Sequence, residues 1–173
     1  MIYITPNFAT TNNEFTLSVH LTEDYTHCPT FLHYQQALLN KEKLALGIIQ
    51  KTWPSVPYLT TKEALLLNIS KKQVKAHLEE YQQLLHLSST SLTKKRTALS
   101  TKEKILLQLL HMLLANKEEV IIEDFFTELS ITDIQELLPL FKQLNQEYQM
   151  NILLFTSNDL LAKSPYVDTS VTD

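Results

Sequence analysis

Two short polar segments hold the residue types that could do chemistry, and each directly follows an apolar run. Glu123 and Asp124 come after Val120–Ile122, and the segment 156–159, Thr-Ser-Asn-Asp, comes after Ile152–Phe155. If the apolar runs are parallel strands, these groups lie at carboxyl ends, where such sheets bind ligands. There Glu123 and Asp124 could hold Mg²⁺ or polarise a water molecule. We favour the simpler interpretation that they are two solvated acids at a strand end.

Other potentially reactive residues give weaker signals. Ser100 and Glu103 precede an apolar helix, and Ser-x-x-Glu is the usual pattern of a capping box. His27, Cys28 and His33 fit no zinc-binding spacing, so we expect no metal site. Cys28 is the only cysteine, which excludes an internal disulfide.

The pattern along the chain predicts strands alternating with helices, an α/β protein with a mostly parallel sheet. The predicted strands are residues 1–4, 31–34, 44–49, 119–123 and 151–156. The predicted helices are residues 14–21, 61–69, 71–86, 101–116 and 131–148. The continuous apolar run at 120–122 is typical of a central strand covered on both faces. We expect the strand at Ile152–Phe155 to lie beside one that begins at Ile2.

The order of these segments resembles the ATPase domain of ABC transporters. Leu99–Glu103 matches the start of the signature loop, with Thr101 and Lys102 at its glycine positions. Glu123–Asp124 takes the place of the Walker B Asp-Glu pair, and Ser157 takes the place of the switch histidine. The resemblance therefore implies a P-loop NTPase-like fold with a helical subdomain inserted.

The first half of the chain supports the resemblance. Thr5–Asn12 is similar to a Walker A loop at Pro6, Asn7 and Ala9, but it lacks the glycines, the lysine and the serine. Leu44–Gln50 resembles the strand that leads to the Q-loop, and Leu59–Leu65 resembles the entry to the helical subdomain. The chain has one glycine, whereas a phosphate-binding loop needs residues without Cβ. We therefore expect no nucleotide, no other cofactor and no catalytic residue.

Length and charge set further limits. A chain of 173 residues fits one domain, with a core subdomain at 1–59 and 116–165, a helical subdomain at 60–115 and a flexible tail at 166–173. The resemblance implies that the antiparallel β-subdomain of the family is lacking. Net charge −4 and pI about 5.9 argue against a nucleic-acid surface. We interpret the one basic cluster, Lys94–Arg96, as a solvated turn. No apolar run reaches membrane-spanning length, so we expect a cytoplasmic location, at the membrane only through a partner.

The segment after Gln50 is where the resembled family receives a helix of its membrane subunit. It contains Trp53, Tyr58 and Leu59, and Trp and Tyr are frequent interface anchors. These aromatic residues either bind a partner or bury against the helical subdomain. The leading hypothesis is a non-catalytic subunit that associates with a permease or an intact ATPase. The alternatives are an adaptor without a transporter and a true ATP-binding ATPase with divergent motifs.

Overall fold

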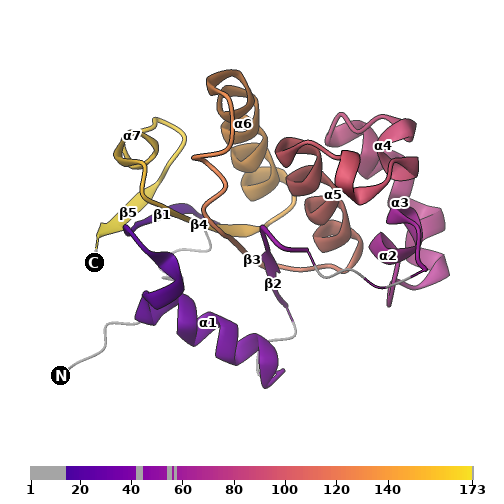
Figure 1. Cartoon of the computed structure of the whole chain (residues 1–173), viewed down its shortest axis with the longest axis horizontal. Helices are drawn as coiled ribbons and strands as arrows, with labels where there is room; N and C mark the ends of the chain where they lie inside the picture. Colours follow the sequence, from indigo (N-terminus) through magenta and orange to yellow (C-terminus); the bar gives the residue numbers. More distant parts are fainter. Residues whose placement is uncertain (1–14, 42–44, 54–55, 57, 173) are drawn as a thin grey trace. The chain divides into compact units, whose positions relative to one another are not determined.

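The computed structural model describes residues 15–41, 45–53, 56 and 58–172, and these contain a five-stranded sheet. Its order is β2-β3-β4-β1-β5 (Figure 1). The pairings β1–β4, β1–β5 and β3–β4 are parallel. The strands are β1 (Leu17–Leu21), β2 (Leu46–Ile49), β3 (Glu119–Ile122), β4 (Asn151–Thr156) and β5 (Thr169–Thr172). The expected α/β chain with a mostly parallel sheet is confirmed.

The chain divides into two compact units. Unit 1 comprises residues 1–48 and 118–173, and unit 2 comprises residues 49–117. Unit 1 contains η1 (Tyr25–His27), α1 (Pro29–Leu39), α6 (Ile131–Glu147) and α7 (Asp159–Ala162). Unit 2 contains α2 (Thr61–Leu65), α3 (Lys71–Leu84), α4 (Ser89–Thr93), η2 (Arg96–Ala98) and α5 (Thr101–Leu114). None of the helices in the described part of the chain is long and apolar enough to cross a membrane.

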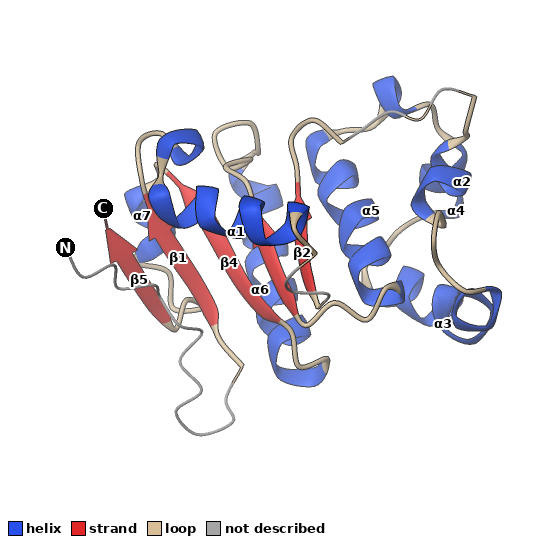
Figure 2. Cartoon of the chain, turned by 90° about the horizontal axis from the view of Figure 1, so that it is seen from below, coloured by secondary structure: helices blue, strands red, loops and turns tan. Residues whose placement is uncertain are grey.

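The sheet of unit 1 is covered on both faces, by α1 on one and α6 on the other (Figure 2). Phe31 and Tyr34 of α1 pack in one cluster with Leu153 and Phe155 of β4. Because side chains alternate along a strand, Ile152 and Leu154 point to the opposite face, and both are fully buried. This two-sided burial explains why β3 and β4 read as continuous apolar runs.

Side-chain hydrogen bonds cap the helices of unit 2 and connect one helix to another. Ser100 caps α5 and forms a capping box with Glu103, as the sequence predicted. Gln73 Nε2 of α3 donates to Asn116 Oδ1 after α5, 3.0 Å away. α5 is the most buried element of the unit, which follows from its wide apolar stripe.

Several turns have a left-handed backbone without glycine. His86, Asn116 and Gln149 each lie two residues after a helix and have φ of 51°, 51° and 55°. His86 and Asn116 close Schellman-type ends, with Leu87 N donating to Gln82 O and Lys117 N to Met112 O, both at 2.9 Å. The chain's one glycine, Gly47, is instead in β2.

Three local expectations are wrong. The predicted helix at 14–21 contains strand β1, in which Leu17 and Val19 are spaced by two and fully buried. The predicted strand at 31–34 lies in α1, which begins at Pro29, a residue whose fixed φ suits the first helical position. The expected tail at 166–173 includes β5, which pairs with β1 from Ser18–Thr169 to Leu21–Thr172.

The expected neighbour of β4 is also wrong. β4 lies between β3 and β1, so Ile152 pairs with Leu17 rather than with a strand at Ile2. Residues 1–14, which include the predicted strand at 1–4 and the Walker A-like segment Thr5–Asn12, lie outside the described residues.

Candidate functional site

The candidate site lies in unit 1, where β1, β3 and β4 end at one edge of the sheet. Since these strands are parallel, the segments after Leu21, Ile122 and Thr156 meet at that edge. The Thr22 N–H donates to the Thr156 carbonyl at 2.9 Å, which ties the loop after β1 to β4. β1, the loop Thr22–Cys28 and α1 form the strand–loop–helix arrangement in which P-loop proteins bind phosphate. We call this segment, Thr22–Cys28, the site loop.

Three backbone N–H groups of the site loop donate to acceptors within the loop. Asp24 Oδ1 accepts from the Thr26 N–H at 3.0 Å and from Thr26 Oγ1 at 2.5 Å. The His27 N–H donates to Asp24 O at 3.2 Å, and the Cys28 N–H to Tyr25 O at 3.1 Å. Asp24 Oδ2 lies 2.7 Å from His27 Nδ1. The hydrogen bonds from Thr26 and His27 hold the pKa of the Asp24 carboxyl below its usual range.

The helix after the loop is also poorly equipped to hold an anion. α1 begins at Pro29, which has no N–H, and its N-cap Cys28 makes no side-chain cap bond. Residues 22–40 contain neither lysine nor arginine.

Asp124 joins β3 to β4. Its carboxylate is 8% exposed and accepts from Thr156 Oγ1 (3.3 Å), the Ser157 N–H (3.1 Å), Ser157 Oγ (3.2 Å) and the Phe126 N–H (3.2 Å). The expectation of two solvated acids is therefore wrong, because both Glu123 and Asp124 are buried. The hydroxyl groups of β4's end make the buried charge tolerable.

Glu123 faces the site loop. Tyr25 Oη donates to Glu123 Oε2 at 3.4 Å. Burial, and then the nearby Glu123 charge, raise the pKa of Tyr25 to about 12, so the phenol stays protonated and remains a donor. An aromatic side chain of the loop thus covers the first acid after β3.

A hollow of about 780 Å³ opens at this edge. Glu23, Asp24 and His27 of the site loop line it, together with Ser157 after β4. Cys28 also lines it and has Sγ 3.6 Å from His20 Nε2, while the His20 ring stacks on Phe155. Within the described residues, no group of three or more His, Cys, Asp or Glu side chains could hold a metal ion.

The residues predicted to meet a partner all lie in unit 2. Gln50 directly follows β2, and the Gln108 side chain pairs with its backbone: the Gln50 N–H donates to Gln108 Oε1 at 2.9 Å, and Gln108 Nε2 donates to Gln50 O at 3.0 Å. Gln108 is 3% exposed. The sequence analysis missed it, although a glutamine inside an otherwise apolar helix stripe is a signal that could have found it.

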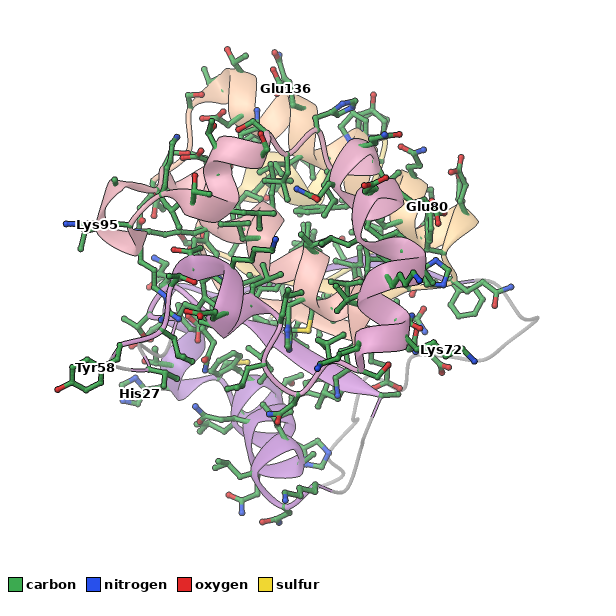
Figure 3. All side chains as sticks on the ribbon, turned by 90° about the vertical axis from the view of Figure 1, so that its right-hand side faces the viewer. His27, Tyr58, Lys72, Glu80, Lys95 and Glu136 are labelled. Carbon is green, nitrogen blue, oxygen red and sulfur yellow. The ribbon has the colours of Figure 1, made fainter. Side chains whose placement is uncertain are left out.

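The aromatic residues after Gln50 differ in burial. Trp53 is half-buried, and the Arg96 guanidinium lies 4.9 Å from the centre of its ring. Tyr58 is fully exposed, has φ 70°, and projects away from the ribbon (Figure 3). Leu59 is half-buried, and its N–H donates to Val56 O at 3.3 Å.

Comparison of the structure with solved structures places this geometry in a known fold. A post-hydrolysis dimer of the ATP-binding cassette MJ0796, bound to ADP and Pi, is similar over 92% of this chain and 81% of its own, with TM-score 0.68 and 14% identity. The chain has the fold of an ABC transporter ATPase. A structure of an ATP-binding subunit of an ABC transporter is similar over 92% of this chain and 74% of its own, with TM-score 0.69 and 18% identity.

A third structure with the ABC ATPase fold is cbiO1 from Clostridium perfringens, part of the transporter complex cbiONQ. It has TM-score 0.67 and 12% identity over 91% of this chain and 72% of its own. No protein-family model and no curated protein matches the sequence. The ABC ATPase fold is thus established by structure, at identities too low to carry over an activity.

Proposed function

We propose that this chain is a non-catalytic subunit with the ABC ATPase fold, which associates with a membrane permease or an intact ATPase and acts structurally or as a regulator. The observation that carries the proposal is the site loop. It follows β1 and precedes α1, yet it contains two carboxylates and neither lysine nor arginine.

Phosphate binding at such a loop depends on backbone N–H groups turned towards the anion and on a lysine. In the site loop, the N–H groups of Thr26, His27 and Cys28 donate to groups of the loop itself. Asp24 adds a negative charge where a phosphate would have to approach, and charges of like sign repel. These features favour a loop that is closed to nucleotide.

The second acid position supports the same proposal. The Asp124 carboxylate oxygens accept hydrogen bonds from Thr156, Ser157 and Phe126. A general base must instead reach a water molecule. In this arrangement Asp124 holds β3 to β4 and has a structural role.

The partner side of the proposal rests on Gln50, Trp53, Tyr58 and Leu59 in unit 2, and we keep residues 60–115 as the corresponding helical subdomain. Tyr58 has an aromatic ring fully in solvent, where a partner can reach it, and tyrosine is a frequent interface anchor.

Thermal melting tests the nucleotide part. A ligand at 100 times its Kd would stabilise the folded state by about 2.7 kcal/mol, so millimolar ATP-Mg²⁺ is expected to leave the melting temperature unchanged. A rise in melting temperature on adding ATP-Mg²⁺ would overturn the non-catalytic assignment and favour an ATPase with divergent motifs.

The partner part is tested by co-purification with candidate permease and ATPase subunits. Tyr58→Ala removes an exposed ring and is expected to reduce recovery of the partner with no change in melting temperature. Tyr166→Ala, which alters another exposed tyrosine in unit 1, is the matched control. If the unmodified chain, Tyr58→Ala and Tyr166→Ala recover equal amounts of the partner, docking at this segment is refuted.

A further inference from the structure

The two units carry opposite charge, which the overall value of −4 conceals. Unit 2 contains ten lysines and one arginine against four glutamates, a net charge of +7. Unit 1 contains four basic and fifteen acidic residues, a net charge of −11. The division becomes visible only when residues 49–117 are counted apart from the rest of the chain.

Part of this positive charge gathers beside the proposed partner segment. Thr61 Oγ1 at the start of α2 donates to the Lys94 carbonyl at 2.6 Å, so Lys62 and the turn Lys94–Arg96 lie close together. Arg96 in turn covers one side of Trp53. We call the four residues Lys62, Lys94, Lys95 and Arg96 the basic cluster.

One acid is already committed within this region. Glu103 accepts from Lys94 Nζ at 2.6 Å, from the Ser100 N–H at 2.9 Å and from Ser91 Oγ at 2.9 Å. It therefore offsets Lys94, while Lys62 and Lys95 are exposed. Lys95 and Tyr58 project to the same side of the molecule in Figure 3.

We propose that the basic cluster, together with Trp53 and Tyr58, docks an acidic segment of a partner protein. The inference rests on the proposed function only in placing the partner at Gln50–Leu59. Opposite charges steer association and set its orientation, whereas the aromatic anchor supplies most of the affinity.

The charge distribution favours a short acidic segment over a long polyanion. Exposed charges are screened beyond about 8 Å at physiological ionic strength, so a short segment responds to the cluster and its surroundings. A nucleic acid or an anionic membrane is far larger than the cluster, and the same chain would present it with the −11 charge of unit 1. Binding to either of these without binding to an acidic peptide is therefore an outcome that would overturn the proposal.

The test measures binding of a labelled, glutamate-rich helical peptide to the full chain, with the same peptide in glutamine form as the control ligand. The glutamate peptide is expected to bind, and its affinity is expected to fall as the salt concentration rises from about 50 to 200 mM. The glutamine peptide is expected to bind at least about tenfold more weakly, a difference of roughly 1.4 kcal/mol.

Two matched charge-reversal variants locate the site. Lys62→Glu with Lys95→Glu alters the basic cluster, and Lys72→Glu with Lys75→Glu makes the same change of net charge on α3. Lys72 and Lys95 project to opposite sides in Figure 3, and all four lysines are exposed. The first pair is expected to weaken binding about tenfold and the second less than about threefold. Tyr58→Ala should also weaken it, because the ring is part of the proposed surface.

Three results would overturn the inference: equal losses in both charge-reversal pairs, equal binding of the two peptides, or binding of anionic vesicles or duplex RNA without binding of the glutamate peptide. The proposed function is judged separately. Stabilisation by ATP-Mg²⁺ would remove the non-catalytic assignment without touching the peptide result. If the glutamate peptide does not bind but a permease or ATPase subunit still co-purifies, only the inference of an acidic partner segment is refuted.

Discussion

Asp124 follows β3, and its carboxylate is held by groups at the end of β4 and just after it. Its buried carboxylate accepts from two side chains and two backbone N–H groups that connect β3 to the segment after β4. A hydrogen bond to a charged group contributes about 1.5–3 kcal/mol to the free energy of unfolding. The chemistry of a residue is therefore set by what surrounds it, which its position in the sequence does not reveal.

Asp124→Ala is expected to lower the free energy of unfolding by about 2–4 kcal/mol, because it leaves the buried Thr156 hydroxyl and the buried Phe126 N–H without this acceptor. Urea denaturation measures the change. Asp159→Asn, at an exposed acid paired with Lys163, is the control and should change stability by less than about 0.5 kcal/mol. A small effect of Asp124→Ala would show that the carboxylate does not hold the strand ends together.

Glu103 makes stability depend on acid. Burial raises its pKa, but the hydrogen bonds from Lys94, the Ser100 N–H and Ser91 outweigh burial and lower it from 4.5 to about 2. Because the folded pKa is depressed, this stabilisation is fully present above about pH 4.5 and is lost as the pH falls towards 2.

Glu103→Gln is therefore expected to destabilise the protein at pH 7 and to flatten the decline of its stability between pH 4.5 and 2. Chemical denaturation at a series of pH values gives both results. Glu79→Gln on an exposed part of α3 is the control, and its pH profile should parallel that of the unmodified chain.

At the scale of elements, β5 depends on one residue that precedes it. Asp168 Oδ2 accepts from the Leu17 N–H at 2.8 Å, and the Asp168 N–H donates to the Leu17 carbonyl at 2.8 Å. Lys142 of α6 also pairs with the Asp168 carboxylate, at 2.6 Å. Since the side chains of β5 are exposed, apolar burial contributes little to holding this strand in place.

Asp168→Ala is expected to release β5 from β1. Backbone amides of Thr169–Thr172 should then exchange with solvent faster, by about tenfold or more if the opening free energy falls by 1.4 kcal/mol. Amides of α5 in unit 2 should keep their exchange rates. Unchanged exchange in β5 would mean that the ladder with β1 suffices to hold it.

The elements that sequence predicted well are those with one strong pattern. Helix α5 combined a capping box with a wide apolar stripe, and β4 was an unbroken apolar run, so both were predicted within two residues. β1 was not predicted because it is only five residues long, and Ser18 and His20 interrupt its apolar run. The site loop was missed with it: nothing in Thr22–Cys28 suggests a loop beside Asp124 until β1 is known to pair with β4.

At the scale of the whole molecule, the opposite charges of the two units set how the chain responds to salt. Unit 1 at −11 and unit 2 at +7 each contain like charges that repel one another. Repulsion among exposed charges weakens as the Debye length shortens from about 10 Å at 0.1 M to about 3 Å at 1 M salt.

Potassium chloride is accordingly expected to raise the melting temperature, by a few degrees if screening adds about 1 kcal/mol. A neutral osmolyte at matched osmolality separates screening from a general solute effect. A fall in melting temperature on adding the salt would show that ion pairs such as Lys142–Asp168 outweigh the repulsion.

The left-handed turns made without glycine leave the protein with room for improvement by design. At His86 and Gln149 a side chain occupies a conformation that glycine adopts freely, at a cost of about 1 kcal/mol each. We therefore expect His86→Gly and Gln149→Gly, both at helix ends, to raise the thermal stability of the protein. Because each left-handed turn is local, each substitution by glycine can raise the free energy of unfolding independently of the others.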